Sequence, residues 1–386
     1  MDNKLIDFFK SYQEADELLE VRMASVKQHT DSISTGSYAL DNALSLGGIP
    51  KGRILQYYGS AGSGKSLMSL LAIREAQKEP DTKQLYIDAE QTADPSWMRR
   101  LGLDLNRVII LNGFKASNGR ELFELILGVP KENAKTHAYD GKKKEGLLDK
   151  IASKEININL IVLDSLGTIV PPGEDVSTVG KAEMTRMARF LTPTFKKLSL
   201  EVYKANIPFI VINHKRDGMD PYGPNHSFSG GNSYSHSLSA NIYFEAIQRK
   251  DAIILDEKEN KIGHTLRASV EKSKFGPQKK CELKVNFTLG VVGINEEIAT
   301  LALDYDIVTK PSSMSYEYNS EKWVGYEKFT TAISENDALA TELLQKIKEA
   351  RDFKLYGTNM PNVESSVESS GEDSITKSKK QKKVKI

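Results

Sequence analysis

The octapeptide Gly59-Ser60-Ala61-Gly62-Ser63-Gly64-Lys65-Ser66 fits the pattern G-x-x-x-x-G-K-[ST] without a mismatch. Residues 53–58 before it are short, aromatic and branched and predict a strand, and the residues after it have apolar side chains at helical spacing. In such a loop, glycines let the backbone wrap around phosphate oxygens, to which the N–H groups at the helix start donate. Lys65 is expected to reach the β- and γ-phosphates, and the Ser66 hydroxyl to ligate Mg²⁺. Because strand, loop and helix are in register, we predict a nucleoside triphosphate site rather than a glycine-rich turn.

The composition indicates a cytoplasmic protein with about two or three domains. The chain has 386 residues, and 53 basic against 52 acidic residues give a net charge of +1, which by itself suggests no polyanion partner. The single cysteine, Cys281, excludes an internal disulfide and fits a reducing compartment. The N-terminus carries acidic residues and no long apolar run, so we expect no secretion signal. No stretch approaches the ~20 apolar residues that cross a bilayer, so we expect no membrane partner.

Further strands of the same sheet are predicted at residues 84–90, 108–113, 159–165 and 208–214. The first, third and fourth of them close on Glu90, Asp164 and His214. Because ligands bind at the carboxyl ends of the strands in such sheets, we expect these side chains to gather beside the phosphate loop. A carboxylate in the position of Asp164 reaches Mg²⁺, mostly through water, and lies beside Ser66.

The connecting segments differ strongly in composition. Residues 129–157 are rich in lysine and poor in apolar residues, which predicts an insertion or a long surface connection. A helix is predicted from Lys181 to about Ala205, with an interruption near Pro193. Residues 171–180 read as a loop, and residues 215–236, rich in Gly, Ser and Asn, as a mobile one.

The remaining segments complete the predicted organisation. Three strands that look antiparallel are expected at residues 241–248, 264–273 and 281–289. The fold class is then α/β, a mainly parallel twisted sheet with helices on both faces. The predicted parts are an N-terminal helical arm at 1–32, a core at 33–289, a small C-terminal α/β domain at 290–356 and a disordered tail at 357–386. The apolar stripe of the arm fits a helix that packs on its own domain or one that is offered to a partner.

Six segments taken together resemble the RecA family of homologous-recombination ATPases. They are ISTGSYALDNALSLGGIPKGRI, GSAGSGKS, YIDAEQTADPSWMRRLG, LIVLDSLG, FIVINH and SGGN, in this order, and the likeness runs from about Ile33 to Arg351. YIDAE, and GGN after the long loop, do not belong to phosphate-loop proteins in general. INH in place of INQ, and VEKSK, are more similar to phage recombinases of the UvsX type.

The resemblance implies a RecA-type core and a DNA-dependent ATPase that forms helical filaments on single-stranded DNA and pairs it with homologous duplex DNA. It implies ATP and Mg²⁺ at the interface between subunits, and mediator and single-strand-binding proteins as further partners. Two departures stand out. The tail ends in KSKKQKKVKI, where the bacterial family has an acidic tail, and the family offers no counterpart for the insertion at residues 129–157.

The resemblance also implies roles in the ATP site. Glu90 matches the glutamate that positions and activates the attacking water, although alone it would be an ordinary strand-end carboxylate. Asp94 and Trp97 match the pair that holds adenine by a hydrogen bond and by stacking, with Trp where the bacterial family has Tyr. His214 matches a glutamine that senses the γ-phosphate, and a lone histidine is otherwise more often structural.

Two further sets of residues acquire roles only through the resemblance. Lys272 and Lys274 match paired lysines that reach the ATP of the neighbouring subunit, where composition alone would predict solvated lysines at a strand end. Met184 matches an apolar wedge between base triplets. Phosphate contacts are implied for Arg189, for Arg216 and for the backbone of Gly230, Gly231 and Asn232. The loop at 171–180 carries two acids of its own, so its charge does not argue for DNA.

Two other functional classes remain open on the sequence. A ring-forming helicase on the same core would also have a phosphate loop and a DNA-contacting loop, but it would translocate rather than pair strands. A nucleotide-gated DNA scaffold would scarcely hydrolyse ATP. Electron microscopy with single-stranded DNA and a non-hydrolysable ATP analogue tests the first alternative, because a recombinase should form helical filaments and a helicase discrete rings. A steady-state ATPase assay tests the second.

Overall fold

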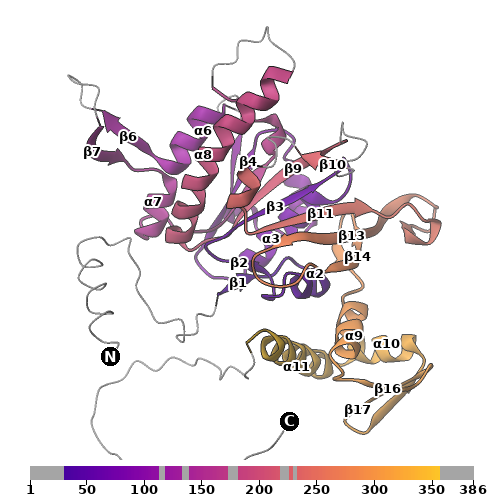
Figure 1. The fold of residues 1–386 in the computed structure, drawn as a ribbon. Helices are drawn as coiled ribbons and strands as arrows, with labels where there is room; N and C mark the ends of the chain where they lie inside the picture. Colours follow the sequence, from indigo (N-terminus) through magenta and orange to yellow (C-terminus); the bar gives the residue numbers. More distant parts are fainter. Residues whose placement is uncertain are drawn as a thin grey trace, which may run out of the picture.

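The computed structural model describes residues 30–112, 118–132, 139–172, 181–217, 226–228 and 233–356. A large sheet with helices on its faces forms the upper part of the molecule, and a smaller lobe lies below it (Figure 1). Almost all of the predicted arm at 1–32, most of both predicted loops and the tail at 357–386 lie outside the described residues. Within the described ranges, no helix combines the length and the apolar character that a membrane span requires.

The first half of the chain alternates strands and helices. In order it contains β1 (Ser32–Ile33), α2 (Tyr38–Ala43), β2 (Ile49–Pro50), β3 (Ile54–Gly59), α3 (Lys65–Ala76), β4 (Lys83–Asp88), α4 (Pro95–Arg100), η1 (Leu105–Arg107), β5 (Val108–Asn112), α6 (Gly119–Leu127), β6 (Val129–Glu132), β7 (Tyr139–Lys144), α7 (Leu147–Ala152), β8 (Ile158–Asp164), η2 (Leu166–Thr168) and α8 (Lys181–Ala205), where η marks a 3₁₀ helix.

The second half is richer in antiparallel strands. It contains β9 (Phe209–Asp217), β10 (His226–Phe228), η3 (Tyr234–Ser237), β11 (Ala240–Ala246), η4 (Lys250–Ala252), β12 (Ile253–Leu255), β13 (Lys261–Ser273), β14 (Lys280–Asn286), β15 (Gly290–Val292), α9 (Ile294–Asp304), β16 (Thr309–Ser312), β17 (Ser315–Tyr318), β18 (Glu321–Val324), α10 (Tyr326–Glu335) and α11 (Asp337–Tyr356).

The large sheet has the strand order β15-β14-β13-β11-β3-β9-β8-β4-β5. Its parallel part runs from β11 to β5, and β13, β14 and β15 extend it by antiparallel pairing. The α/β fold with a mainly parallel sheet is therefore confirmed. The prediction that residues 241–248 form an antiparallel strand is wrong on one side, because β11 pairs in parallel with β3 and antiparallel only with β13. A hydrophobic run does not reveal its partner's direction.

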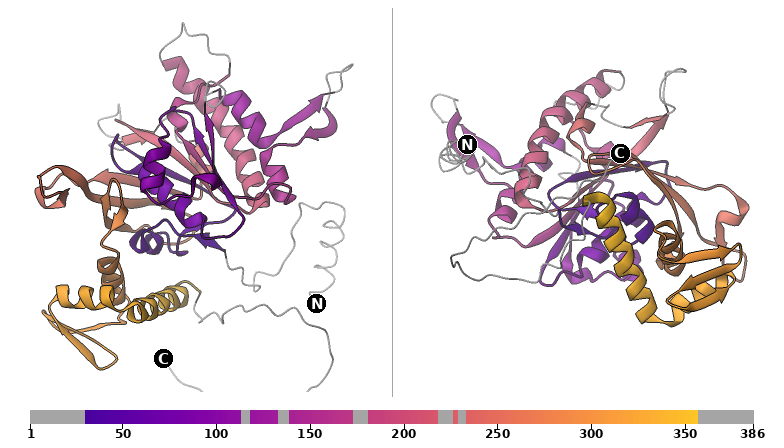
Figure 2. Two further views of the ribbon diagram at one scale, coloured as in Figure 1. Left: turned by 180° about the vertical axis from the view of Figure 1, so that it is seen from behind. Right: turned by 60° about the horizontal axis from the view of Figure 1, so that its bottom comes forward.

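Helices cover both faces of this sheet (Figure 2). Every residue of β3 and β8 is buried, as expected for central parallel strands covered on two sides. One hydrophobic layer joins α2 and α3 to the sheet and includes Leu71, and the other joins α6, α7 and α8 and includes Phe195. The carboxyl ends of the parallel strands therefore stay free of core helices, which leaves that edge for a site.

Helix α8 is continuous, so the predicted interruption near Pro193 is wrong. Pro193 removes one backbone donor from the helix. Leu191 and Phe195, which flank it, are both fully buried and hold the two halves of the helix on the sheet. The Thr192 hydroxyl also donates to the carbonyl oxygen of Ala188 at 2.7 Å. Tertiary packing thus maintains a helix that the local sequence would break.

The lysine-rich stretch at 129–157 has more structure than a surface connection. Strands β6 and β7 form an antiparallel hairpin that projects from the core beside α6 and α8 (Figure 1). Helix α7 then buries Leu148 and Ile151 in the layer that covers the sheet. The low average hydrophobicity of the stretch hid these two anchoring residues.

The lower lobe combines α9, α10 and α11 with the three-stranded sheet β16-β17-β18 around a hydrophobic cluster of its own. Phe329 and Leu343 are fully buried in this cluster. Residues 290–292 form β15 of the large sheet, so the lobe begins at α9. The division of the chain into an arm, a core and a C-terminal domain stays a prediction.

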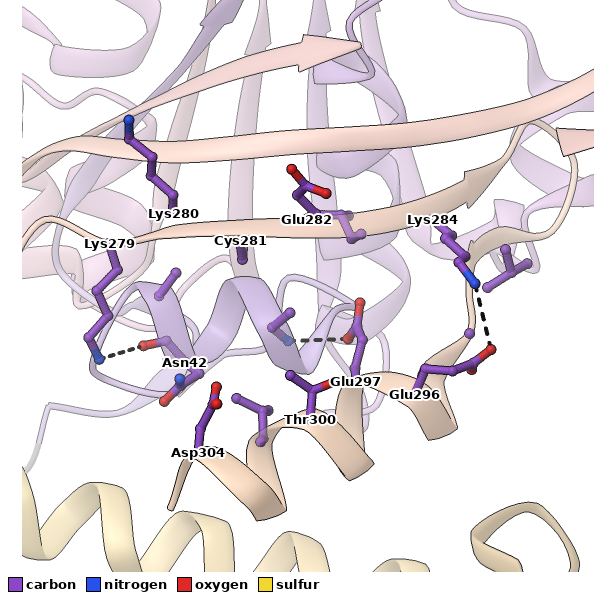
Figure 3. A pocket seen from close by; sticks show the side chains of 16 residues that line it. Asn42, Lys279, Lys280, Cys281, Glu282, Lys284, Glu296, Glu297, Thr300 and Asp304 are labelled. Atoms are coloured by element: carbon purple, nitrogen blue, oxygen red, sulfur yellow. Dashed lines mark hydrogen bonds and ion pairs between the residues drawn. The ribbon is translucent and has the colours of Figure 1, made fainter. Parts of the chain in front are cut away.

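A buried carboxylate joins the lobe to the core at the junction of α9 and α2 (Figure 3). Glu297 accepts hydrogen bonds from the Ser37 hydroxyl at 2.9 Å and from the Ala39 backbone N–H at 3.2 Å. Tyr305, at the end of α9, donates to the Asn42 side-chain oxygen at 2.5 Å. Burial raises the pKa of Glu297 to about 7, against the lowering effect of its hydrogen bonds. We therefore expect this carboxyl to change its protonation state near neutral pH.

Candidate nucleotide-binding site

The phosphate loop connects the end of β3 to the start of α3, as the sequence predicts. Gly62 and Gly64 have φ values of 70° and 87°, in the left-handed region that favours glycine. A Cβ at Gly64 would lie 2.5 Å from a methyl carbon of Leu266 on β13, so a side chain at this position would also displace Leu266. The Lys65 ammonium donates to the Ser60 carbonyl oxygen at 2.8 Å. Burial lowers the pKa of Lys65, and the nearby carboxylates Asp164 and Glu90 oppose that shift.

Ser66 and Asp164, the predicted Mg²⁺ residues, are in direct contact. The Ser66 hydroxyl donates to Asp164 Oδ2 at 2.7 Å, and the Tyr86 hydroxyl donates to the same oxygen at 2.5 Å. Asp164 is only 4% exposed, and burial raises its pKa although both hydrogen bonds lower it. A hydroxyl and a carboxylate suit Mg²⁺, which takes one or two protein groups together with phosphates and water. Within the described residues no cluster of three or more His, Cys, Asp or Glu could hold a metal ion.

Glu90 and His214 are brought together from different strands. His214 Nε2 and Glu90 Oε1 lie 2.7 Å apart, and the Ser165 hydroxyl donates to the same carboxylate oxygen. The hydrogen bond from His214, reinforced by Ser165 and by the charge of Lys65, holds the pKa of Glu90 below its usual range. Glu90 therefore stays ionised at neutral pH, as a residue that orients water must.

Backbone pairing explains why these groups meet. His214 lies opposite Gly59 in the register of β9 and β3, and Asp88 lies opposite Asp164 in that of β4 and β8. The buried Asp88 carboxylate accepts hydrogen bonds from the backbone N–H groups of Thr92 and Ala93, at 3.1 and 2.9 Å. These bonds fix the turn that carries Glu90.

The predicted adenine-binding residues line the same cavity of about 370 Å³ as the phosphate loop. Asp94 caps α4 by accepting from the Ser96 N–H at 2.8 Å, and Trp97 Nε1 donates to the Phe287 carbonyl oxygen at 2.6 Å. The lining residues that were not predicted include Tyr86, His264 and Phe287. Tyr86 lies inside the predicted strand, but nothing in the sequence places the other two beside a loop some 200 residues earlier in the chain.

Lys272 and Lys274 lie away from the phosphate loop of their own chain. Their ammonium groups donate to the carbonyl oxygens of Ser235 and His236, the second at 3.1 Å. Leu266 of the same strand packs on Gly64, and a strand rises about 3.3 Å per residue, so Lys272 is about 20 Å further along. A single chain does not bring these lysines to the site.

The predicted DNA-contacting residues are only partly described. Arg189 is exposed on α8. Met184 belongs to α8 and Arg216 to β9, but their side chains lie outside the described part of the structure. The same holds for all of residues 230–232. Their contacts with DNA stay predictions.

A buried hydrogen-bond network that the sequence did not suggest lies beneath His214. Asn213 accepts from the His214 backbone N–H at 2.8 Å and donates to the Tyr234 hydroxyl at 2.8 Å, and Tyr234 in turn donates to Gln56. Tyr234 lies in the segment 215–236 that was predicted to be a mobile loop. The network therefore connects the site to the end of the loop that was predicted to bind DNA.

Comparisons with known proteins give concordant results. A family model described as the RecA N-terminal domain matches residues 16–129 and 126–292. Protein RecA of Leptospira meyeri is 30% identical over 341 residues, which are 87% of this chain and 78% of that protein. Protein RecA of Helicobacter pylori strain Shi470 is 30% identical over 323 residues, which are 83% of this chain and 84% of that protein.

Proposed function

Because this chain belongs to the RecA family, we propose that it is a DNA-dependent ATPase of DNA recombination and repair. It hydrolyses ATP to ADP and phosphate with Mg²⁺, forms helical filaments on single-stranded DNA and pairs that DNA with a homologous duplex. INH and VEKSK favour the UvsX type of recombinase. Its site of action would be the cytoplasm, with mediator and single-strand-binding proteins as partners.

One observation carries this proposal: the phosphate loop, the Ser66–Asp164 pair and the Glu90–His214 pair converge on one edge of the sheet. The loop alone would support nucleotide binding in many classes of protein. An ionised carboxylate fixed beside it by a histidine and a serine adds the means to orient an attacking water.

Different residues of this chain would bind the phosphates, hold Mg²⁺ and orient the attacking water. The amides at the start of α3 and the Lys65 ammonium bind the phosphates and neutralise charge that develops during transfer. Ser66 and Asp164 would hold Mg²⁺, which supplies further charge stabilisation when bound. Glu90 would orient the water, and His214, which contacts Glu90 and lies opposite Gly59, would report the γ-phosphate to the segment after β9. Asn213 and Tyr234 provide a physical connection for that signal.

Two measurements test the proposal. Steady-state ATP hydrolysis should rise on addition of single-stranded DNA and should be lost in Lys65→Ala, because the ammonium that neutralises the phosphates is removed. Electron microscopy with single-stranded DNA and a non-hydrolysable ATP analogue should show helical filaments. Discrete rings would favour a helicase motor, and negligible hydrolysis with intact DNA binding would favour a scaffold.

A further inference from the structure

His264 on β13 is a buried histidine whose polar atoms are left without partners. Its side chain is 3% exposed, and among the described residues neither Nδ1 nor Nε2 has a hydrogen-bond partner. Buried polar atoms are nearly always paired, because an unpaired one loses its bonds with water and gains nothing in return. An aliphatic side chain of similar size would fill this position without that loss.

The position of His264 relates it to the nucleotide site. It lines the cavity that also contains the phosphate loop, Asp94 and Trp97. Residues two apart on a strand share a face, so His264 lies on the same side of β13 as Leu266, which packs on Gly64. His264 is about 7 Å further along the strand, beyond the phosphate-binding backbone.

The contacts of His264 point to the nucleoside end of the cavity. Its ring meets the ring of Phe287 edge-on, with centroids 5.4 Å apart. The carbonyl oxygen of Phe287 accepts the indole N–H of Trp97, the residue expected to stack on the base. Burial, with Lys261 nearby, lowers the pKa of His264, so the ring is neutral at neutral pH. A neutral imidazole offers one donor and one acceptor.

We propose that His264 hydrogen-bonds the nucleoside part of the bound nucleotide, through its base or its ribose, and so helps this site select nucleotides over simpler polyphosphates. The inference rests on the proposed function, because it assigns a residue to the same ATP site. Ligand groups would supply the hydrogen-bond partners that the protein does not. The unpaired nitrogens that destabilise the free protein would then stabilise the complex. A site built to hydrogen-bond its ligand discriminates strongly against ligands that lack the matching group.

The test uses two variants of the full chain and two properties of each. His264→Leu removes both ring nitrogens, and His264→Gln replaces the ring with an amide that can still donate and accept hydrogen bonds. Thr265→Val, a change at the adjacent position whose side chain points to the other face of β13, is the matched control. Melting temperature without nucleotide reports the fold. Calorimetric titration with ADP, 2′-deoxy-ADP and tripolyphosphate, each with Mg²⁺, reports binding.

We expect His264→Leu to melt at the same or a higher temperature than the wild type and yet to bind ADP about tenfold more weakly. Its affinity for tripolyphosphate should be unchanged, and His264→Gln should recover part of the ADP affinity. If the loss vanishes with 2′-deoxy-ADP, the bond is to the ribose 2′-hydroxyl. If it persists, the bond is to the rest of the nucleoside.

Unchanged ADP affinity in His264→Leu would overturn the inference, as would an equal loss for ADP and tripolyphosphate or a large fall in melting temperature. Those results would make the ring a structural residue. A wild-type chain that bound ADP no better than tripolyphosphate would instead contradict the nucleotide site itself, which distinguishes failure of the proposed function from failure of the inference.

Discussion

Lys272 and Lys274 should act on the ATP bound by the neighbouring subunit. Lys272 lies about 20 Å along β13 from the residue that packs on the phosphate loop, well beyond the ~8 Å over which a charge is felt at physiological ionic strength. The ammonium groups donate to the carbonyl oxygens of Ser235 and His236 in η3, at the end of the segment 215–236 that was predicted to be a mobile loop. Cations in this place can stabilise a transferring phosphoryl group only across an interface.

The perturbation is the double variant Lys272→Ala, Lys274→Ala. It should bind ATP normally but lose most DNA-stimulated hydrolysis, by about 10³-fold if the lysines contribute as arginine fingers do. Lys280→Ala, which removes an exposed lysine from the neighbouring strand β14, is the matched control and should keep its activity.

Mixing identifies the subunit on which the lysines act. Glu90→Gln subunits lack the water-orienting carboxylate but keep both lysines, whereas the double lysine variant keeps Glu90 but lacks the lysines. Each of the two variants should therefore be inactive by itself. In a random equimolar filament, about a quarter of the head-to-tail interfaces would join an intact Glu90 to intact lysines, and about a quarter of the wild-type activity should return. Mixtures that stay inactive, although electron microscopy of labelled subunits shows both in one filament, would refute action across the interface.

Three further outcomes follow from the same contacts. Glu90→Gln should retain ATP binding and form long-lived filaments on DNA, since only the orientation of water is lost; rapid turnover of ATP by this variant would contradict the role. His214→Ala should bind ATP and DNA separately but lose most of the stimulation of hydrolysis by DNA, and unchanged stimulation would leave the histidine structural. Glu297→Gln should flatten the pH dependence of the melting temperature. Because burial raises the pKa of Glu297 from 4.5 to about 7, the folded state binds its proton more tightly, and stability contributed by the neutral carboxyl, up to about 3 kcal/mol, is lost as pH rises from 4.5 through 7. An equally steep profile in the variant would assign the pH dependence to other groups.

The site could be predicted to the extent that its residues lie in local patterns. The phosphate loop is contiguous, and Glu90, Asp164 and His214 each end a strand, so parallel pairing alone brings them to one edge. The contact of His214 with Glu90 was not predicted, because it depends on the register of the strands, which a single sequence does not reveal.

Features that depend on tertiary packing could not be predicted. Helix α8 continues through Pro193 because buried residues on both sides hold it against the sheet. Strand β11 pairs in parallel with β3 because the antiparallel part of the sheet begins only at β13. His264 reaches the site from β13, and nothing in its local sequence distinguishes it from a core histidine. Its lack of a partner is visible only in three dimensions.

Homologous strand exchange tests the central claim most directly. Circular single-stranded DNA and linear homologous duplex, incubated with the protein, Mg²⁺ and ATP, should give joint molecules on an agarose gel. They should be absent without ATP, with heterologous duplex and with Lys65→Ala, because pairing needs the ATP-bound filament and base complementarity. ATP-dependent separation of duplex strands without joint molecules, or vigorous DNA-stimulated hydrolysis with no pairing, would contradict the assignment of this chain as a recombinase.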